Sequence, residues 1–266
     1  MNSLHAYGCS LTYGSEISGE GIQHLMPGDI RSPWPFFLSE KLGVTNTYNH
    51  ARCGASTRDI ALVALDNIVK FPEDIHVIGW TWSSRINFWP ETDDSATQDQ
   101  PNLILNTTMK DEQIKSLGGV YSDLFKNYVK VMGNREWLVQ FLTYFNLVEA
   151  VAHKFGTKLI HVQIGNNPLS WKDGMQYINN QTIPHNYYNK QNTPTGAEVE
   201  SKLIDHALYK TWQEADIIYR DGMYMHTLQN YDFDTHHNGV HWNKVGHQLV
   251  AELVYNNLKN KNAATI

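Results

Sequence analysis

The sequence predicts an α/β protein in which helices cover both faces of a mainly parallel sheet. Segments with the character of buried strands alternate with segments of helical periodicity along the chain, which is typical of parallel sheets. The chain has 266 residues, 41% of them hydrophobic and 18% charged, as in an ordinary globular domain. No internal repeat is visible. We therefore expect one three-layer α/β/α domain, residues 1–266, with a sheet of about five strands.

The amino-terminal elements are predicted to form a strand–helix–strand unit. Residues 3–8 (SLHAYG) have the character of a short buried strand that ends at Gly8. Residues 34–43 (WPFFLSEKLG) predict an amphipathic helix that ends at Gly43, because glycine is favoured just after a helix. Residues 45–51 (TNTYNHA) can form the second strand.

The helix predicted over residues 56–71 has a well-defined start. Ser56 or Thr57 can cap it, and Asp59 suits its first turn because the amino end of a helix favours negative charge. Residues 74–80 (DIHVIGW) follow as the third strand. The apolar face predicted for this helix comprises Ile60, Leu62, Val63, Leu65, Ile68 and Val69.

The second half of the chain continues the alternation. Residues 134–156 predict a long apolar helix. Residues 157–165 (TKLIHVQIG) form the clearest strand, apolar almost throughout, as expected when both faces of a sheet are covered. Residues 215–221 (ADIIYRD) can form a short fifth strand, and residues 243–260 predict a final amphipathic helix.

Two long insertions interrupt this order, at residues 84–132 and 165–212. The first begins acidic and polar, and the second is rich in Asn, Pro and Tyr. Long irregular segments in a compact domain are usually lids, binding loops or disordered. Because ligands of open parallel sheets bind beyond the carboxyl ends of the strands, we expect the chemistry there.

Charge and composition argue against several classes of partner. The formal net charge is −6 and no basic run is present, which disfavours nucleic acid and anionic membrane surfaces. No apolar stretch is long enough for a transmembrane helix, and no secretory signal is visible. We therefore expect a cytoplasmic protein. Two alternatives stay open: export by a route that uses no cleaved signal, and assembly into a larger particle. The two cysteines give no metal-binding pair.

Small polar residues and glycines gather where the predicted strands end. Four segments stand out along the chain: residues 8–11 (GCSL), 52–56 (RCGAS), 79–82 (GWTW) and 238–241 (NGVH). In this order they resemble the sequence blocks of the SGNH (GDSL-type) hydrolase family, and the resemblance extends from residue 7 to about residue 255. It implies a flavodoxin-like α/β/α sandwich and the hydrolysis of an ester or acyl group, often on acetylated sugars or lipids.

The resemblance also implies roles for individual residues. Ser10 matches the family's nucleophile, Gly54 the glycine whose N–H serves the oxyanion hole, and His241 the general base. Thr81 stands where the family has an Asn that donates to the oxyanion. Asn238 stands where the family has the Asp that orients the His.

The residues support this chemistry on physical grounds. A serine hydroxyl is a poor nucleophile until a base removes its proton, and His241 can take that proton from Ser10. The far ring nitrogen then needs an acceptor, and Asn238 can supply only an uncharged oxygen. Asp232, Asp234 or a backbone carbonyl are the alternatives. No phosphate-binding or α/β-hydrolase elbow pattern is present around the serine.

The predicted oxyanion hole consists of the backbone N–H groups of Ser10 and Gly54 and the hydroxyl of Thr81. Arg85, four residues after Thr81, could add positive charge to the cleft. Aromatic side chains accompany the same segments and could line the cleft or belong to the core; they are Trp80, Trp82 and Trp242.

These features predict a serine esterase or deacetylase that acts on a small-molecule or glycan ester without a cofactor. A second hypothesis is a non-catalytic SGNH domain that binds a ligand or partner. It is favoured because Thr81 and Asn238 stand where the family has its Asn and Asp. A metal site built from His236, His237, His241 and either Asp232 or Asp234 ranks last, because neighbouring histidines on an extended chain face opposite ways. The sequence therefore predicts a hydrolase without a bound metal.

Overall fold

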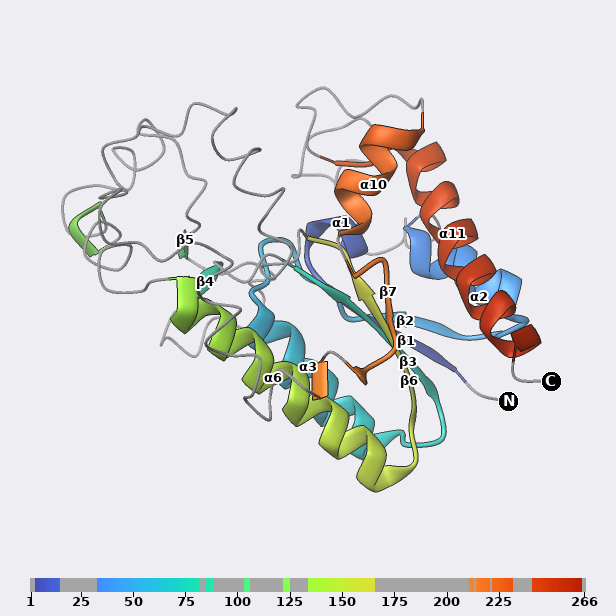
Figure 1. The fold of residues 1–266 in the computed structure, drawn as a ribbon, viewed down its shortest axis with the longest axis horizontal. Helices are drawn as coiled ribbons and strands as arrows, with labels where there is room; N and C mark the ends of the chain where they lie inside the picture. The colour runs from blue at the N-terminus through green and yellow to red at the C-terminus, as the bar shows by residue number, and fades with distance from the viewer. Residues whose placement is uncertain are drawn as a thin grey trace.

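The protein has a five-stranded parallel sheet with helices on both faces (Figure 1). The strand order is β2-β1-β3-β6-β7, and all four pairings are parallel. The strands are β1 (Leu4–Tyr7), β2 (Thr47–Asn49), β3 (Ile75–Trp80), β6 (Lys158–Gln163) and β7 (Ile217–Ile218). The computed structural model describes residues 3–14, 33–81, 85–88, 103–105, 122–124, 134–165, 211–212, 214–220, 222–231 and 241–264. The expected α/β/α class is confirmed.

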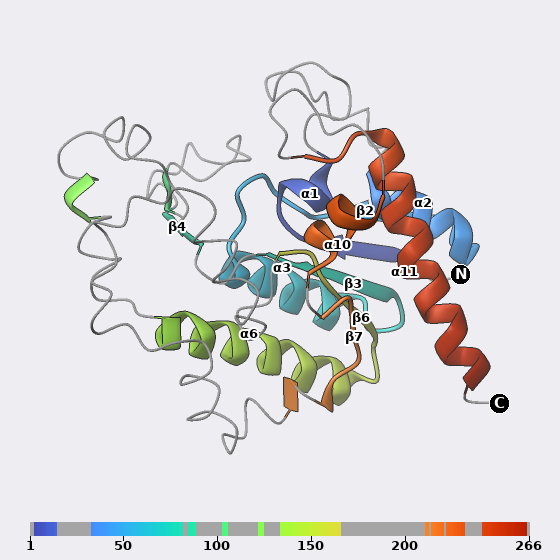
Figure 2. The same cartoon turned by 45° about the horizontal axis from the view of Figure 1, so that its top comes forward.

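The helices divide between the two faces of the sheet, as the turned view in Figure 2 also shows. One face carries α3 (Thr57–Lys70) and α6 (Asn134–Phe155). The other carries α2 (Trp34–Leu42), α10 (Met223–Asn230) and α11 (Lys244–Ala264). Within the described residues, no helix is long and apolar enough to span a membrane.

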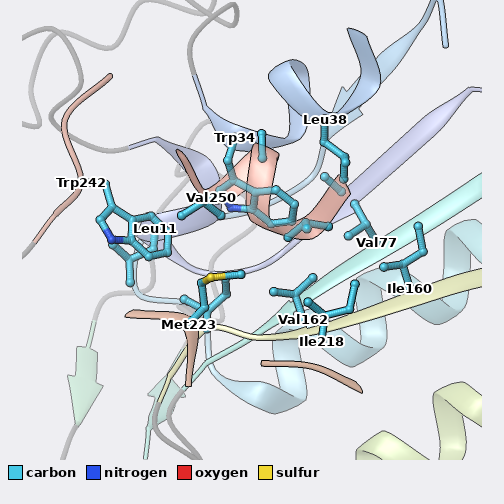
Figure 3. Close-up of a cluster of buried hydrophobic side chains, with 14 of the residues drawn as sticks. Leu11, Trp34, Leu38, Val77, Ile160, Val162, Ile218, Met223, Trp242 and Val250 are labelled. Atoms are coloured by element: carbon cyan, nitrogen blue, oxygen red, sulfur yellow. The ribbon is translucent and has the colours of Figure 1, made fainter. Parts of the chain in front are cut away.

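Alternation along the strands gives the two faces different cores. On the α2/α11 side the core is apolar, and Figure 3 shows residues of the strands, such as Val77 and Val162, packed beneath Trp34 and Leu38 of α2. On the α3/α6 side, polar residues of the strands are also buried; they are His5, His76, His161 and Gln163. Strands that were predicted from their mainly apolar sequence therefore bury a row of polar side chains on the α3/α6 face.

The start of α3 follows from its sequence, but its buried face differs from the prediction. Ser56 and Asp59 form a complete capping box, which satisfies two backbone N–H groups at the helix end. Leu62 and Val69 were predicted to be buried but are 48% and 51% exposed. They lie seven residues apart on the outer side of the helix. The face against the sheet is made by Ile60, Ala61, Ala64 and Ile68, and its alanines let α3 approach closely.

Four of the described elements were not anticipated from the sequence. A single turn, α1 (Ser10–Tyr13), follows β1 directly, and α10 precedes the last helix. The first insertion contains an antiparallel pair, β4 (Ile86–Phe88) and β5 (Leu103–Leu105). Most of both insertions lies outside the described residues.

Candidate active site

Ser10 begins a helical turn at the carboxyl end of β1. Cys9 precedes α1 in an extended conformation, and Gly14 ends the turn in the left-handed region with φ of 90°. Leu11 is buried in the α2/α11 core, whereas Ser10 is partly exposed. The serine hydroxyl is therefore presented at the edge of the sheet where parallel sheets bind ligands.

His241 lies against Ser10. Its Nε2 is 2.9 Å from Ser10 Oγ, although 231 positions separate the two residues. The adjacent Trp242 is fully buried, and its Nε1 donates to Thr227 Oγ1 over 3.0 Å, which anchors the segment that carries the histidine. At this distance an imidazole can accept the proton of a hydroxyl group.

The loop that carries Gly54 is fastened to the same end of β1. The backbone N–H of Arg52 donates to Gly8 O over 3.0 Å, and that of Ala55 donates to Arg52 O over 3.1 Å. Gly54 has φ of 75°, a left-handed conformation that favours glycine. The glycine of this loop is thus required by the backbone, and the loop lies next to the strand that leads into Ser10.

Thr12 explains two further glycines near the site. A Cβ added to Gly8 would lie 2.2 Å from Thr12 Oγ1, and one added to Gly79 would lie 2.5 Å from the same atom. The threonine side chain therefore occupies space that only glycines leave open, one directly after β1 and one in β3. This close packing sets the position of α1 over the sheet.

Thr81 and Arg85 are the two predicted side chains of the oxyanion hole and the cleft. Thr81 is fully buried, and among the described residues its Oγ1 has no hydrogen-bond partner. Arg85 Nη1 donates to Ala55 O over 3.3 Å, so the guanidinium lies beside the turn that contains Gly54. Both residues are thus associated with the end of the sheet that carries Ser10.

The two described tryptophans of the site segments are core residues and do not line a cleft. Trp80 is fully buried against Phe141 and Phe145 on the α3/α6 side. Trp242 is fully buried on the opposite side, where Figure 3 shows it with Leu11. Of the two alternatives that the sequence left open for these residues, cleft or core, the structure places both side chains in the core, where they hold the site segments in place.

Several predicted residues lie outside the described part of the chain. These are Trp82, Asn238 and the alternative orienting or metal-binding candidates Asp232, Asp234, His236 and His237. Among the residues that the structure describes, no group of three or more His, Cys, Asp and Glu side chains is arranged to hold a metal ion. Both cysteines are free thiols, Cys9 buried and Cys53 partly exposed.

A buried chain of hydrogen bonds supports the end of β3. Trp80 Nε1 donates to His161 Nδ1 over 2.9 Å, and His161 Nε2 lies 2.5 Å from Glu149 Oε1. Because Nδ1 accepts from the indole, the imidazole carries its proton on Nε2 and donates it to the carboxylate. This hydrogen bond lowers the pKa of Glu149. The sequence offered no signal for this chain, since its members come from β3, β6 and α6 and meet only through the pairing of the two strands and the packing of the helix on the sheet.

Three more histidines form a hydrogen-bonded cluster on the same face. His5 Nε2 lies 3.1 Å from Asp74 Oδ2, and His5 Nδ1 lies 3.0 Å from His50 Nε2. His76 Nδ1 lies 2.9 Å from the Tyr7 hydroxyl, and its ring stacks on His5 with centroids 5.1 Å apart. In the sequence of β1, His5 and Tyr7 lie two positions apart and so on one face of the strand. This spacing could have indicated that the α3/α6 face of the sheet buries polar side chains.

Burial keeps these imidazoles neutral. It lowers the pKa of His5 and His76, and it lowers that of His50 to about 4. The positive charge of Arg52 lowers the pKa of His50 further, as protonation of His5 or His76 would, whereas Asp74 partly offsets the effect of burial on His5. The cluster is therefore uncharged at neutral pH.

A further buried histidine joins α11 to α2. His247 Nδ1 accepts the backbone N–H of Trp34 over 3.2 Å, a group that has no partner within its own helix because α2 begins there. Burial lowers the pKa of His247 to about 3. The start of α2 is thus tied to the helix that follows His241.

The chain was also compared with known proteins. No protein-family model and no curated protein sequence matches it. TesA superposes with a TM-score of 0.48 at 12% identity, over 97% of this chain and 99% of that chain. A putative lipolytic protein of the G-D-S-L family from Desulfitobacterium hafniense DCB-2 gives 0.42 at 11% identity, with 97% and 99% covered. The acetyl xylan esterase AlAXEase gives 0.45 at 13% identity, with 96% and 98% covered.

Proposed function

We propose that this chain is a serine hydrolase of the SGNH type that cleaves an ester or acetyl group from a small-molecule or glycan substrate. The observation that carries the proposal is the 2.9 Å contact between Ser10 Oγ and His241 Nε2. The order of the four sequence segments gives separate support. It places Ser10 in the first segment and His241 in the last, and these are the two segments that the contact joins.

In the proposed reaction, His241 takes the proton of Ser10 as the hydroxyl oxygen attacks the ester carbonyl carbon. The tetrahedral intermediate collapses to an acyl-serine, and the protonated His241 gives its proton to the departing alcohol. Water then attacks the acyl-serine with His241 again as base, which releases the acid and restores the hydroxyl.

The negative oxygen of the intermediate needs hydrogen-bond donors that are already in place. The backbone N–H groups of Ser10 and Gly54 are the proposed donors, with Thr81 in the position of the family's Asn. Arg85 adds a positive charge beside the Gly54 turn, where its guanidinium donates to Ala55 O.

Asn238 is the proposed orienting residue for His241, because its side-chain oxygen can accept from the far ring nitrogen. It brings no negative charge to stabilise the imidazolium. An Asp-to-Asn replacement in a serine-protease triad costs about 10⁴ in rate, so we expect a slow enzyme.

Hydrolysis of p-nitrophenyl acetate tests the proposal. We expect Ser10→Ala and His241→Gln each to lower kcat by about 10²-fold, because losing the serine or the histidine of a triad costs about 10⁶ and a chain without the Asp has already lost about 10⁴ of this. Ser39→Ala is the matched control, since Ser39 is a buried serine of α2 whose Oγ donates to Phe36 O over 2.7 Å. Equal rates for the wild type and Ser10→Ala would remove the hydrolase proposal in favour of a non-catalytic binding domain.

A further inference from the structure

One amide side chain bridges the two segments that carry the proposed oxyanion donors. Asn49, the last residue of β2, donates from Nδ2 to Thr12 O over 3.0 Å. Its Oδ1 accepts the backbone N–H of Ala51 over 3.2 Å. The Thr12 carbonyl belongs to the turn that begins at Ser10, and Ala51 begins the loop that contains Gly54.

The turn that carries Ser10 depends on such outside support. α1 has only four residues, which is too short to be stable by itself, and its last carbonyl groups have no partner within the helix. Asn49 Nδ2 supplies a donor to Thr12 O and lies 3.5 Å from Tyr13 O. The amide therefore replaces the hydrogen bonds that a longer helix would provide.

The opposite end of the same amide fixes the neighbouring loop. Because Asn49 Oδ1 accepts the Ala51 N–H, it fixes the direction of the chain after β2. The next N–H, that of Arg52, donates to Gly8 O over 3.0 Å. Only a side chain that donates and accepts at once can join both segments, and Asn is the residue of this length that does so. Asp could accept from Ala51 but could not donate to Thr12 O.

We propose that Asn49 is a positioning residue that holds the Ser10 turn and the Gly54 loop at a fixed separation. This inference rests on the proposed hydrolase function. An oxyanion hole is effective when its donors are in place before the charge develops, and its two backbone N–H groups here come from separate segments. Asn49 bonds to both segments through one rigid amide group, which links their positions.

Asn49→Asp breaks the bond to Thr12 O selectively and keeps an acceptor for Ala51 N–H. Misplacement of reacting groups by about 1 Å costs on the order of 100-fold, so we expect kcat for Ser10-dependent hydrolysis of p-nitrophenyl acetate to fall tenfold to about 100-fold. KM is expected to stay nearly unchanged. Asn67→Asp is the matched control, because Asn67 Nδ2 makes a comparable bond to Val63 O over 2.9 Å within α3.

Amide hydrogen exchange gives a readout that does not depend on turnover. We expect Asn49→Asp to speed exchange in residues 10–14 and 50–55, while Asn67→Asp leaves both segments as in the wild type. If Asn49→Asp does not fold, Asn49→Ser replaces it, since a serine hydroxyl can still accept from Ala51 N–H but is too short to reach Thr12 O. An unchanged kcat, or a lowered kcat with unchanged exchange in both segments, would overturn the inference. A wild type without Ser10-dependent hydrolysis would instead refute the proposed function, and the exchange comparison would still decide whether Asn49 joins the two segments.

Discussion

Trp80 and His161 lie on neighbouring strands, and the indole Nε1 donates to the imidazole Nδ1 over 2.9 Å. The two strands are also joined at the main chain, because Trp80 O accepts the N–H groups of Ile164 and Gly165 over 2.9 and 3.0 Å. Trp80 is therefore held on both its side chain and its backbone, directly before the proposed oxyanion donor Thr81.

Replacement of His161 by Leu is expected to lower the free energy of unfolding by about 1–3 kcal/mol, because it leaves the buried Trp80 N–H without its acceptor. Urea denaturation measures the change. His153→Leu is the control, since His153 is exposed on the same helix as Glu149. Equal stabilities of the two variants would show that the chain from Trp80 to Glu149 contributes nothing.

Thr81→Val separates a catalytic from a structural role for the buried hydroxyl. Valine has nearly the same shape, and among the described residues Thr81 Oγ1 has no hydrogen-bond partner, so we expect stability to be unchanged or slightly raised. If the hydroxyl donates to the oxyanion, kcat falls by about 10²-fold or more. Steady-state kinetics beside thermal denaturation test this, and an unchanged kcat would exclude Thr81 from the oxyanion hole.

Gly79→Ala is expected to destabilise the protein by about 1–3 kcal/mol, because the added methyl would lie 2.5 Å from Thr12 Oγ1. The double variant Gly79→Ala/Thr12→Ala should recover part of this loss, since it removes the clashing oxygen. Gly156→Ala serves as the comparison: nothing lies near its added Cβ, and its cost comes from a φ of 66°. Thr12→Ala should not restore stability to Gly156→Ala. If the stability losses of Gly79→Ala and Thr12→Ala simply add in the double variant, the packing described above is wrong.

Stability is expected to fall as the pH drops from 6.5 towards about 4. In the unfolded chain His50 titrates with the ordinary histidine pKa of 6.5, whereas in the folded protein burial lowers this pKa to about 4. Between these values the unfolded state binds more protons, so the stability present above pH 6.5 is lost on acidification, at most about 1.4 kcal/mol per pH unit for each proton. His5 and His76 act in the same direction.

Urea denaturation at several pH values between 7 and about 4.5 measures this slope. His50→Gln removes one titrating group, so its slope should be shallower than that of the wild type. Part of the slope should remain, because His5, His76 and His247 also have a lowered pKa. An identical slope in the variant would mean that His50 does not contribute to acid sensitivity.

Much of the fold could be predicted from local sequence. The capping box of Ser56 and Asp59 fixes where α3 starts, and Gly43 ends α2 with φ of 68°. Both signals act over a few residues, so one sequence is enough to recognise them. The proximity of Ser10 and His241 was predicted from the resemblance of the four sequence segments, in their order, to the SGNH family, together with the rule that ligands bind at one edge of a parallel sheet.

The rest depends on contacts that no local pattern encodes. Thr12 reads as an ordinary turn residue until two strands place Gly8 and Gly79 against it. Asn49 gains its role only because β2 is paired with β1, which brings its amide to α1. Leu62 suggests a buried position by its hydrophobicity, but alanines beside it allow the tightest approach of the helix to the sheet.

The 231 positions between Ser10 and His241 also bear on how the protein becomes competent in the cell. During translation Ser10 leaves the ribosome well before His241 has been made, because so many residues lie between them. Contacts of such long range form slowly, because the intervening loop must close first. A nascent chain that ends before residue 241 would thus hold the serine without its proposed base, and any reactivity of the pair would begin only after residue 241 has been made and the intervening chain has folded.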